Sequence, residues 1–120
     1  MTEVWDGLSL FVRDVPLSQD FYAQALGFTF PKPIRDGGTV GFREGLKLGL
    51  YDRQWQTRLG WPEGGVGGVV FSLRTVDIQR SYERLAAIAQ VLGPPQVQPW
   101  GAIAFWFTDP DGHRWELFQL

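Results

Sequence analysis

The sequence predicts an α+β fold built from two βαβββ units, within one domain of 120 residues. The main observation is a pattern that occurs twice, about sixty residues apart. Segments 8–15 and 69–76 each read as a short alternating strand followed by Arg, a small polar residue and Val. The two halves also end alike, because 45–51 resembles 112–118. A repeat of this period indicates one supersecondary unit used twice, each copy covering an apolar face that it cannot bury alone.

The first unit is predicted to span 4–52. Residues 4–12 alternate between apolar and other side chains with a period of two, which indicates a strand. Pro16 suits the first turn of a helix over 16–26, where its missing N–H is not needed, and Gly27 suits the left-handed position that ends it. Further strands are expected at 28–34, 39–42 and 46–51.

A linker over 53–65 and a second unit over 66–120 follow. The linker is polar, is interrupted by Gly and Pro, and carries Trp55 and Trp61. In the second unit, Asp77 is expected to cap a helix that runs to about residue 89. The remaining strands are expected at 69–73, 102–107 and 114–119, the last two joined by the turn Asp109-Pro-Asp-Gly112.

Composition excludes several classes of function. A formal net charge of −2 gives no basic surface, so nucleic acid is not expected as a partner. The longest apolar run, 102–107, is far shorter than the roughly 20 residues that cross a bilayer, so no membrane partner is expected. With no cysteine, the chain has neither disulfides nor thiolate metal sites. The first residues lack the apolar core of a signal peptide, so we expect a cytoplasmic location.

Two segments of the chain carry a resemblance to a known family. The segment 14–28, which ends in Leu26-Gly-Phe28, and the segment 107–118, which contains Asp109-Pro-Asp-Gly112 and Glu116-Leu-Phe118, resemble the vicinal-oxygen-chelate superfamily. That superfamily groups glyoxalase I, extradiol dioxygenases, fosfomycin-resistance enzymes and bleomycin-resistance proteins. The resemblance implies paired βαβββ units that curl around a cleft, usually completed in a homodimer.

The same resemblance places the superfamily's four metal-ligand positions on Gly7, Gly49, Gly68 and Glu116. Glycine has no side-chain donor, so a His/Glu ligand set cannot be assembled there. His113 is the only histidine and falls in a turn, which excludes sites that need two histidines from one chain. We therefore predict neither a metal site nor a cofactor, and we assign no catalytic residue.

Strand alternation indicates which side chains face the cleft instead of the helices. Aromatic walls with a few polar groups suit a planar, drug-sized molecule. The tryptophans on strands could equally serve the core or a dimer interface, and those on loops could be covered by a partner subunit. The predicted ligand-binding residues are Trp5, Ser9, Tyr51, Trp55, Trp61, Ser72, Trp106, Arg114, Glu116 and Phe118.

Three functions are compatible with this pattern. The favoured one is a metal-free protein like those of the bleomycin-resistance branch, which binds and sequesters a planar aromatic compound in the cleft of a homodimer. The second is a glyoxalase- or dioxygenase-like enzyme whose metal site is atypical or lost. The third is a catalytically silent module that senses or scaffolds. The sequence leaves open whether the protein is an enzyme.

Overall fold

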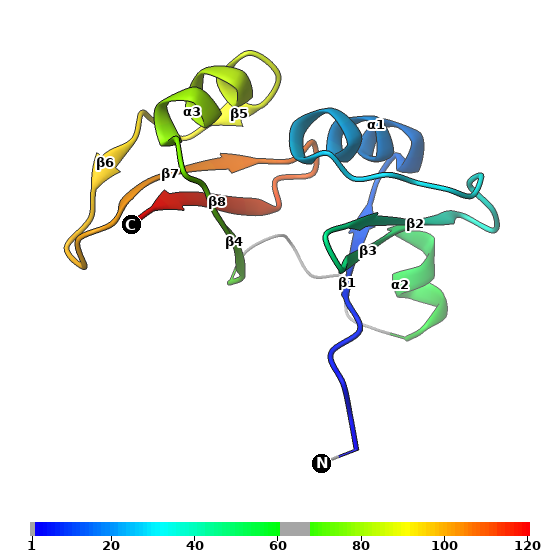
Figure 1. Cartoon of the computed structure of the whole chain (residues 1–120). Helices are drawn as coiled ribbons and strands as arrows, with labels where there is room; N and C mark the ends of the chain where they lie inside the picture. The colour runs from blue at the N-terminus through cyan, green and yellow to red at the C-terminus, as the bar shows by residue number, and fades with distance from the viewer. Residues whose placement is uncertain (1, 61–67) are drawn as a thin grey trace. The chain divides into compact units, whose positions relative to one another are not determined.

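The computed structural model describes residues 2–60 and 68–120, and the chain divides into two compact units, Met1–Gly64 and Gly65–Leu120. The predicted α+β class is confirmed (Figure 1). Unit one contains β1 (Leu8–Val12), α1 (Val15–Leu26), β2 (Gly38–Arg43), β3 (Leu46–Asp52) and α2 (Gln54–Arg58). Unit two contains β4 (Val70–Arg74), α3 (Ile78–Ala86), β5 (Gln90–Val91), β6 (Gln96–Val97), β7 (Ile103–Thr108) and β8 (Arg114–Gln119).

The sheet of unit one has the order β1-β3-β2. β1 runs parallel to β3, and β2 pairs with β3 in the antiparallel sense. One side of the sheet packs against α1, while Figure 1 shows α2 on the other side. The apolar side chains on the α1 side are fully or almost fully buried, as the alternation predicts: Leu10, Val12, Leu48 and Leu50 from the sheet, and Tyr22, Ala25 and Leu26 from the helix.

Local sequence chemistry determines where α1 begins and ends. The Asp14 side chain accepts a hydrogen bond of 3.0 Å from the backbone N–H of Leu17, which caps the helix, and Pro16 lies in its first turn. Gly27 follows the last turn with φ of 71°, a left-handed conformation that glycine adopts without steric cost. The predicted helix over 16–26 is therefore confirmed to within one residue.

Three details of unit one differ from the prediction. The first strand begins at Leu8, not at residue 4. The strand expected at 28–34 is wrong: only Thr29 and Arg35 form bridges to β2, because Pro31 and Pro33 lack the N–H groups that a strand needs. The segment predicted as a linker contains the short helix α2.

The sheet of unit two has the order β4-β8-β7-β5, with β6 also paired to β7. Asp77 caps α3 as predicted, accepting a hydrogen bond of 3.1 Å from the N–H of Arg80. The helix ends at Ala86, earlier than the expected residue 89, and two turn residues follow it. Strand β8 has the predicted bounds, and β7 is shifted by one residue.

An aromatic cluster forms the core of unit two. Trp115 is 1% exposed, and its ring centroid lies 4.9 Å from that of Phe71 and 6.4 Å from that of Phe107. The ring of Tyr82 from α3 meets Phe105 edge-on at 5.4 Å. These contacts place Phe105, Phe107 and Trp115 on the buried side of the sheet, as the alternation predicts.

The pairing within each unit corrects the alignment of the two halves. Gly49 is paired with Ser9 in unit one, and Glu116 is paired with Ser72 in unit two. Ser9 and Ser72 therefore occupy equivalent positions in the two units. Residue 7, two before Ser9, corresponds to Val70, two before Ser72, and not to Gly68, which precedes β4. The error is two residues, and a shift of two keeps every side chain on its predicted face. Valine is no better a metal ligand than glycine, so the conclusion drawn from this position is unchanged.

The helices in the described part of the chain are too short or too polar to span a lipid bilayer. The cytoplasmic location stays a prediction.

Candidate functional site

The side of the unit-one sheet that faces away from α1 borders two cavities. Strand pairing aligns alternate residues of all three strands on this face. The residues that share it are Ser9 and Phe11 from β1, Lys47, Gly49 and Tyr51 from β3, and Gly38, Val40 and Phe42 from β2. We call it the open face.

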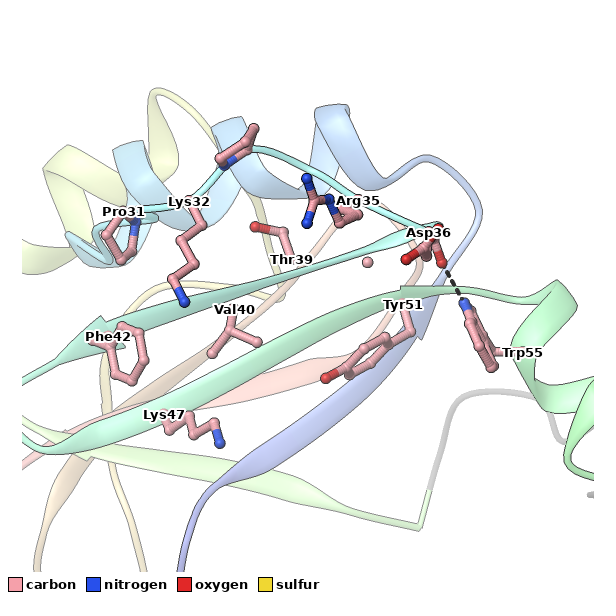
Figure 2. A pocket seen from close by; sticks show the side chains of 12 residues that line it. Pro31, Lys32, Arg35, Asp36, Thr39, Val40, Phe42, Lys47, Tyr51 and Trp55 are labelled. Atoms are coloured by element: carbon pink, nitrogen blue, oxygen red, sulfur yellow. Dashed lines mark hydrogen bonds between the residues drawn. The ribbon is translucent and has the colours of Figure 1, made fainter.

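Two cavities border the open face, and Tyr51 and Trp55 line both of them. Cavity A has a volume of about 440 Å³ and cavity B about 430 Å³, which is within the range of small-molecule sites. Cavity B is lined by Ser9, Phe11, Tyr51, Trp55 and Leu59. Cavity A is lined by Pro31, Lys32, Pro33, Arg35, Asp36, Gly38, Thr39, Val40, Phe42, Lys47, Tyr51 and Trp55 (Figure 2).

The ring of Tyr51 lies flat on the sheet because two neighbouring positions are glycine. A Cβ atom built on Gly49 would lie 2.5 Å from Tyr51 Cε2, and one built on Gly38 would lie 2.6 Å from Tyr51 Cδ1. Contacts this short would force the ring to move. The two glycines therefore make room for an aromatic side chain between cavity A and cavity B.

Trp55 is held beside Tyr51 by contacts of α2 and of the preceding hairpin. The side chain of Asp52 accepts a hydrogen bond of 2.8 Å from the N–H of Gln54, at the start of α2. The indole Nε1–H of Trp55 donates to the carbonyl oxygen of Asp36 at 2.8 Å (Figure 2). The guanidinium of Arg58 lies 5.2 Å from the centroid of the Trp55 ring, within the range of a cation–π contact. The indole is thus fixed at the boundary of the two cavities.

Lys47 contributes a positive charge to cavity A. Its Nζ donates a hydrogen bond of 3.0 Å to Asp6, and both side chains are exposed to solvent. This hydrogen bond, together with the charge of Asp6, raises the pKa of Lys47 above its ordinary value of 10.5. Lys47 therefore carries its charge throughout the neutral pH range.

The open face does not fit the superfamily's metal site. A Cβ on Gly7 would lie 2.5 Å from the backbone oxygen of Lys47, so any side chain there would require the two strands to separate. At Gly49 a ligand side chain would collide with Tyr51. No cluster of three or more His, Asp or Glu side chains suited to a metal ion occurs within residues 2–60 and 68–120. That the protein works without metal stays a prediction.

Five of the predicted ligand-binding residues share one face of the unit-two sheet. Glu116 is paired with Ser72 on one side and with Trp106 on the other, and the Ser72 hydroxyl donates a hydrogen bond of 3.0 Å to Glu116 Oε1. Arg114 and Phe118 are two residues to either side of Glu116 on the same strand, so they point the same way. The fold brings these residues together, and their role in binding stays a prediction.

The other predicted residues have different positions. Ser9, Tyr51 and Trp55 line the cavities of unit one. Trp5 precedes β1 and is 82% exposed, so the strand does not direct it toward a face as predicted. Trp61 lies outside the described residues.

Sequence reasoning missed part of cavity A. Lys32, Arg35, Thr39, Val40 and Phe42 all line it, and none was predicted as a ligand-binding residue. The signal was the sequence Pro31-Lys-Pro33 directly before an edge strand, since two prolines prevent that segment from pairing along the strand and leave a gap.

Comparison with known proteins identifies the family. The model of the Glyoxalase/Bleomycin resistance protein/Dioxygenase superfamily matches residues 6–117. The chain belongs to this superfamily. The predicted family is therefore confirmed, and with it the glyoxalase/bleomycin-resistance type of fold. No curated protein matches the chain.

Solved structures of superfamily members are similar over almost the full chain. A glyoxalase-related enzyme from Fulvimarina pelagi has a TM-score of 0.84 at 23% identity, covering 100% of this chain and 89% of its own. A glyoxalase/bleomycin resistance protein/dioxygenase from Nocardioides has a TM-score of 0.83 at 27% identity, covering 99% and 85%. A lactoylglutathione lyase from Agrobacterium tumefaciens has a TM-score of 0.76 at 19% identity, covering 97% and 92%. At these identities the similarity establishes the fold and leaves the activity open.

Proposed function

We propose that this superfamily member binds a planar aromatic small molecule without a metal ion, and that Tyr51 and Trp55 form the binding surface. The observation that carries the proposal is the position of these two side chains between cavities of about 440 and 430 Å³. A flat ligand in either cavity can stack on an aromatic ring, which contributes about 0.5–1.5 kcal/mol per ring pair beyond the burial of apolar area.

The surroundings of the two rings support binding rather than chemistry. The Trp55 indole is held by its hydrogen bond to Asp36, so this side chain loses little conformational freedom when a ligand binds. Among the described residues that line cavity A there is no histidine, and the one carboxylate, Asp36, is exposed. These residues provide no pair of groups arranged as a nucleophile and its base. We infer that the protein sequesters its ligand, as the bleomycin-resistance branch does.

The proposal includes a homodimer and the predicted residues of unit two. Each sheet has edge strands, among them β1 in unit one and β4 in unit two, and an edge strand can pair with another chain. Val70 on β4 is exposed, as is Phe42 on the open face. We propose that a second copy covers part of this apolar surface, and that Glu116, Arg114 and Trp106 also take part in ligand binding.

Titration with a panel of planar aromatic compounds tests the proposal. Isothermal calorimetry measures affinity, and tryptophan fluorescence reports contact with the indoles. We expect a saturable ligand that raises the melting temperature by mass action. Tyr51→Ala should weaken its binding about tenfold, and Trp55→Phe should remove most of the fluorescence quenching. Trp100→Phe is the matched control, because Trp100 is 66% exposed and lines neither cavity.

Two results would contradict the proposal. A ligand whose affinity is unchanged by Tyr51→Ala and Trp55→Phe would bind elsewhere. Turnover of a bound compound that stops when a chelator is added would establish the alternative, an enzyme of this superfamily with an atypical metal site.

A further inference from the structure

Cavity A has more positive than negative charge at its rim. Of the described residues that line it, Lys32, Arg35 and Lys47 are basic and one, Asp36, is acidic. Lys47 is paired with Asp6, whereas Lys32 and Arg35 form no ion pair and no side-chain hydrogen bond with another described residue. Both of these side chains are exposed, and Figure 2 shows them on the segment that crosses above β2. Two unpaired cations at the rim favour an anionic ligand group.

The outer edge of β2 is open in the middle of this cavity. The segment before β2 pairs with it through Thr29–Phe42 at one end and Arg35–Gly38 at the other, with hydrogen bonds of 2.9 to 3.1 Å. Along a strand in an antiparallel ladder, every second residue directs its N–H and C=O to the same edge. Gly38 and Phe42 direct theirs to the outer edge of β2, so those of Val40, which lies between them, also point there. No backbone partner for Val40 occurs there in the described part of the chain.

The prolines of the crossing segment explain the gap. Pro31 and Pro33 have no N–H, so they cannot donate to the carbonyl oxygen of Val40. A small polar group that enters cavity A can therefore reach a free backbone donor and acceptor.

Thr39 supplies an independent indication that a polar group belongs in this cavity. The residue is only 5% exposed, and its buried Oγ1 has no hydrogen-bond partner among the described residues. Buried hydroxyl groups in proteins are almost always hydrogen-bonded, so an unsatisfied one calls for a bound partner. Thr39 lines cavity A, and Figure 2 shows its side chain on the side of β2 that faces the segment bearing Lys32 and Arg35.

The geometry points to an aromatic carboxylate as the ligand of cavity A. The carboxylate accepts hydrogen bonds from the Thr39 hydroxyl and the Val40 N–H, and Lys32 and Arg35 neutralise its charge. The planar fork of Arg35 matches a planar carboxylate. Thr39 points to the α1 side of β2 and Phe42 to the open face, so the ligand passes round the edge of β2 at Val40, and its aromatic part lies along Phe42 and Tyr51. This inference rests on the proposed function and adds the chemical class of the ligand.

The test compares naphthoate with naphthamide, which has the same rings and no charge. At low ionic strength we expect naphthoate to bind about tenfold more tightly, as charge-assisted hydrogen bonds allow. The difference should narrow as salt is added, since the two cations are exposed. In the double variant Lys32→Gln/Arg35→Gln, naphthoate should lose this advantage while naphthamide keeps its affinity. Arg80→Gln, which removes an exposed charge on α3, is the matched control and should change neither affinity.

Thr39→Val tests the buried hydroxyl separately. Valine has nearly the same shape, so the variant should fold with an unchanged or higher melting temperature, because it removes an unsatisfied buried group. Its affinity for naphthoate should fall several-fold, while its affinity for naphthamide should fall less.

The outcomes separate this inference from the proposed function. Equal affinity for naphthoate and naphthamide would overturn the carboxylate inference and leave aromatic binding intact. A preference for naphthoate that survives Lys32→Gln/Arg35→Gln would place the anion site elsewhere and also overturn it. If neither probe binds and no compound of the aromatic panel does, both proposals fail.

Discussion

Replacing Gly49 with alanine should disturb the binding surface far more than the fold. The added methyl would lie 2.5 Å from Cε2 and 3.2 Å from Cζ of Tyr51, and 3.1 Å from the Ser9 hydroxyl oxygen. Because Tyr51 is only partly buried, its ring can rotate away into solvent. The ring would then no longer lie between cavity A and cavity B.

Two opposing contributions set the effect of Gly49→Ala on stability. Overpacking destabilises a protein by about 1–3 kcal/mol. Here the cost should lie near the lower end of this range, because the Tyr51 ring can move away from the added methyl. Alanine loses less backbone entropy than glycine on folding, which returns about 0.4–1 kcal/mol. The net loss should be about 0–1 kcal/mol, or a fall of roughly 6 °C at most in melting temperature. Binding of an aromatic ligand should weaken about tenfold, as expected for Tyr51→Ala.

A double-mutant cycle isolates the contact between the two residues. In a Tyr51→Ala background the methyl meets no ring, so Gly49→Ala should be neutral or stabilising by about 0.4–1 kcal/mol. Gly7→Ala is the control, because its collision is with the backbone of Lys47 and should persist in that background. Denaturant unfolding, followed by circular dichroism, measures the free energy of unfolding of the wild-type protein, of each single variant and of the double variant. If the effects of Gly49→Ala and Tyr51→Ala are additive, Tyr51 does not lie over Gly49 and the reasoning fails.

Four further predictions can be checked on the same protein. Trp115→Ala should lower the free energy of unfolding by about 3–5 kcal/mol, because it removes a fully buried ring, whereas the exposed Trp100→Ala should change it by less than about 0.5 kcal/mol. Glu116→Ala should weaken ligand binding without unfolding the protein; unchanged affinity would exclude Glu116 from the site. Protein dialysed against zinc, nickel or ferrous iron should retain no stoichiometric metal, and a chelator should not change its melting temperature; tight metal binding abolished by Glu116→Gln would contradict this. Sedimentation should show a homodimer at tens of micromolar, and a monomer at that concentration would refute the predicted association.

The parts of the fold that could be predicted from the sequence are those with a local cause. Asp14, Pro16 and Gly27 determine the ends of α1, and Asp77 determines the start of α3, because capping depends on a few adjacent residues. The buried faces of the strands were also predictable, since alternation depends only on neighbours in the chain.

The errors arose where pairing between distant segments decides the structure. Alternation over 28–34 was typical of a strand, but Pro31 and Pro33 allow only the two terminal bridges to β2. Trp5 shares the alternation of β1, yet it precedes the first paired residue, Leu8. The short helix α2 lacks an apolar repeat that would have revealed it.

The misalignment of Gly68 shows why faces are easier to predict than positions. Aligning the two halves by their apolar strands is insensitive to a shift of two residues, because such a shift leaves the pattern of buried side chains unchanged. The capping residues Asp14 and Asp77 would have given the correct correspondence, since each occurs once per unit at the start of its helix. Gly7 and Val70 are separated by the same number of residues as Asp14 and Asp77, so aligning the two capping residues also aligns Gly7 with Val70.

The glycine at position 49 and the position of the Tyr51 ring are physically linked on the open face. The side-chain space above Gly49 holds either a ligand residue or the Tyr51 ring, because a Cβ atom there already lies within 2.5 Å of that ring. Restoring one histidine at position 49 would therefore displace Tyr51 before any metal could bind, and position 7 would still have no room for a second ligand. Metal binding by side chains at positions 7 and 49 would require Gly7, Gly49 and Tyr51 to change together. We infer that the aromatic surface is the feature that Gly38 and Gly49 serve, because both make room for the Tyr51 ring.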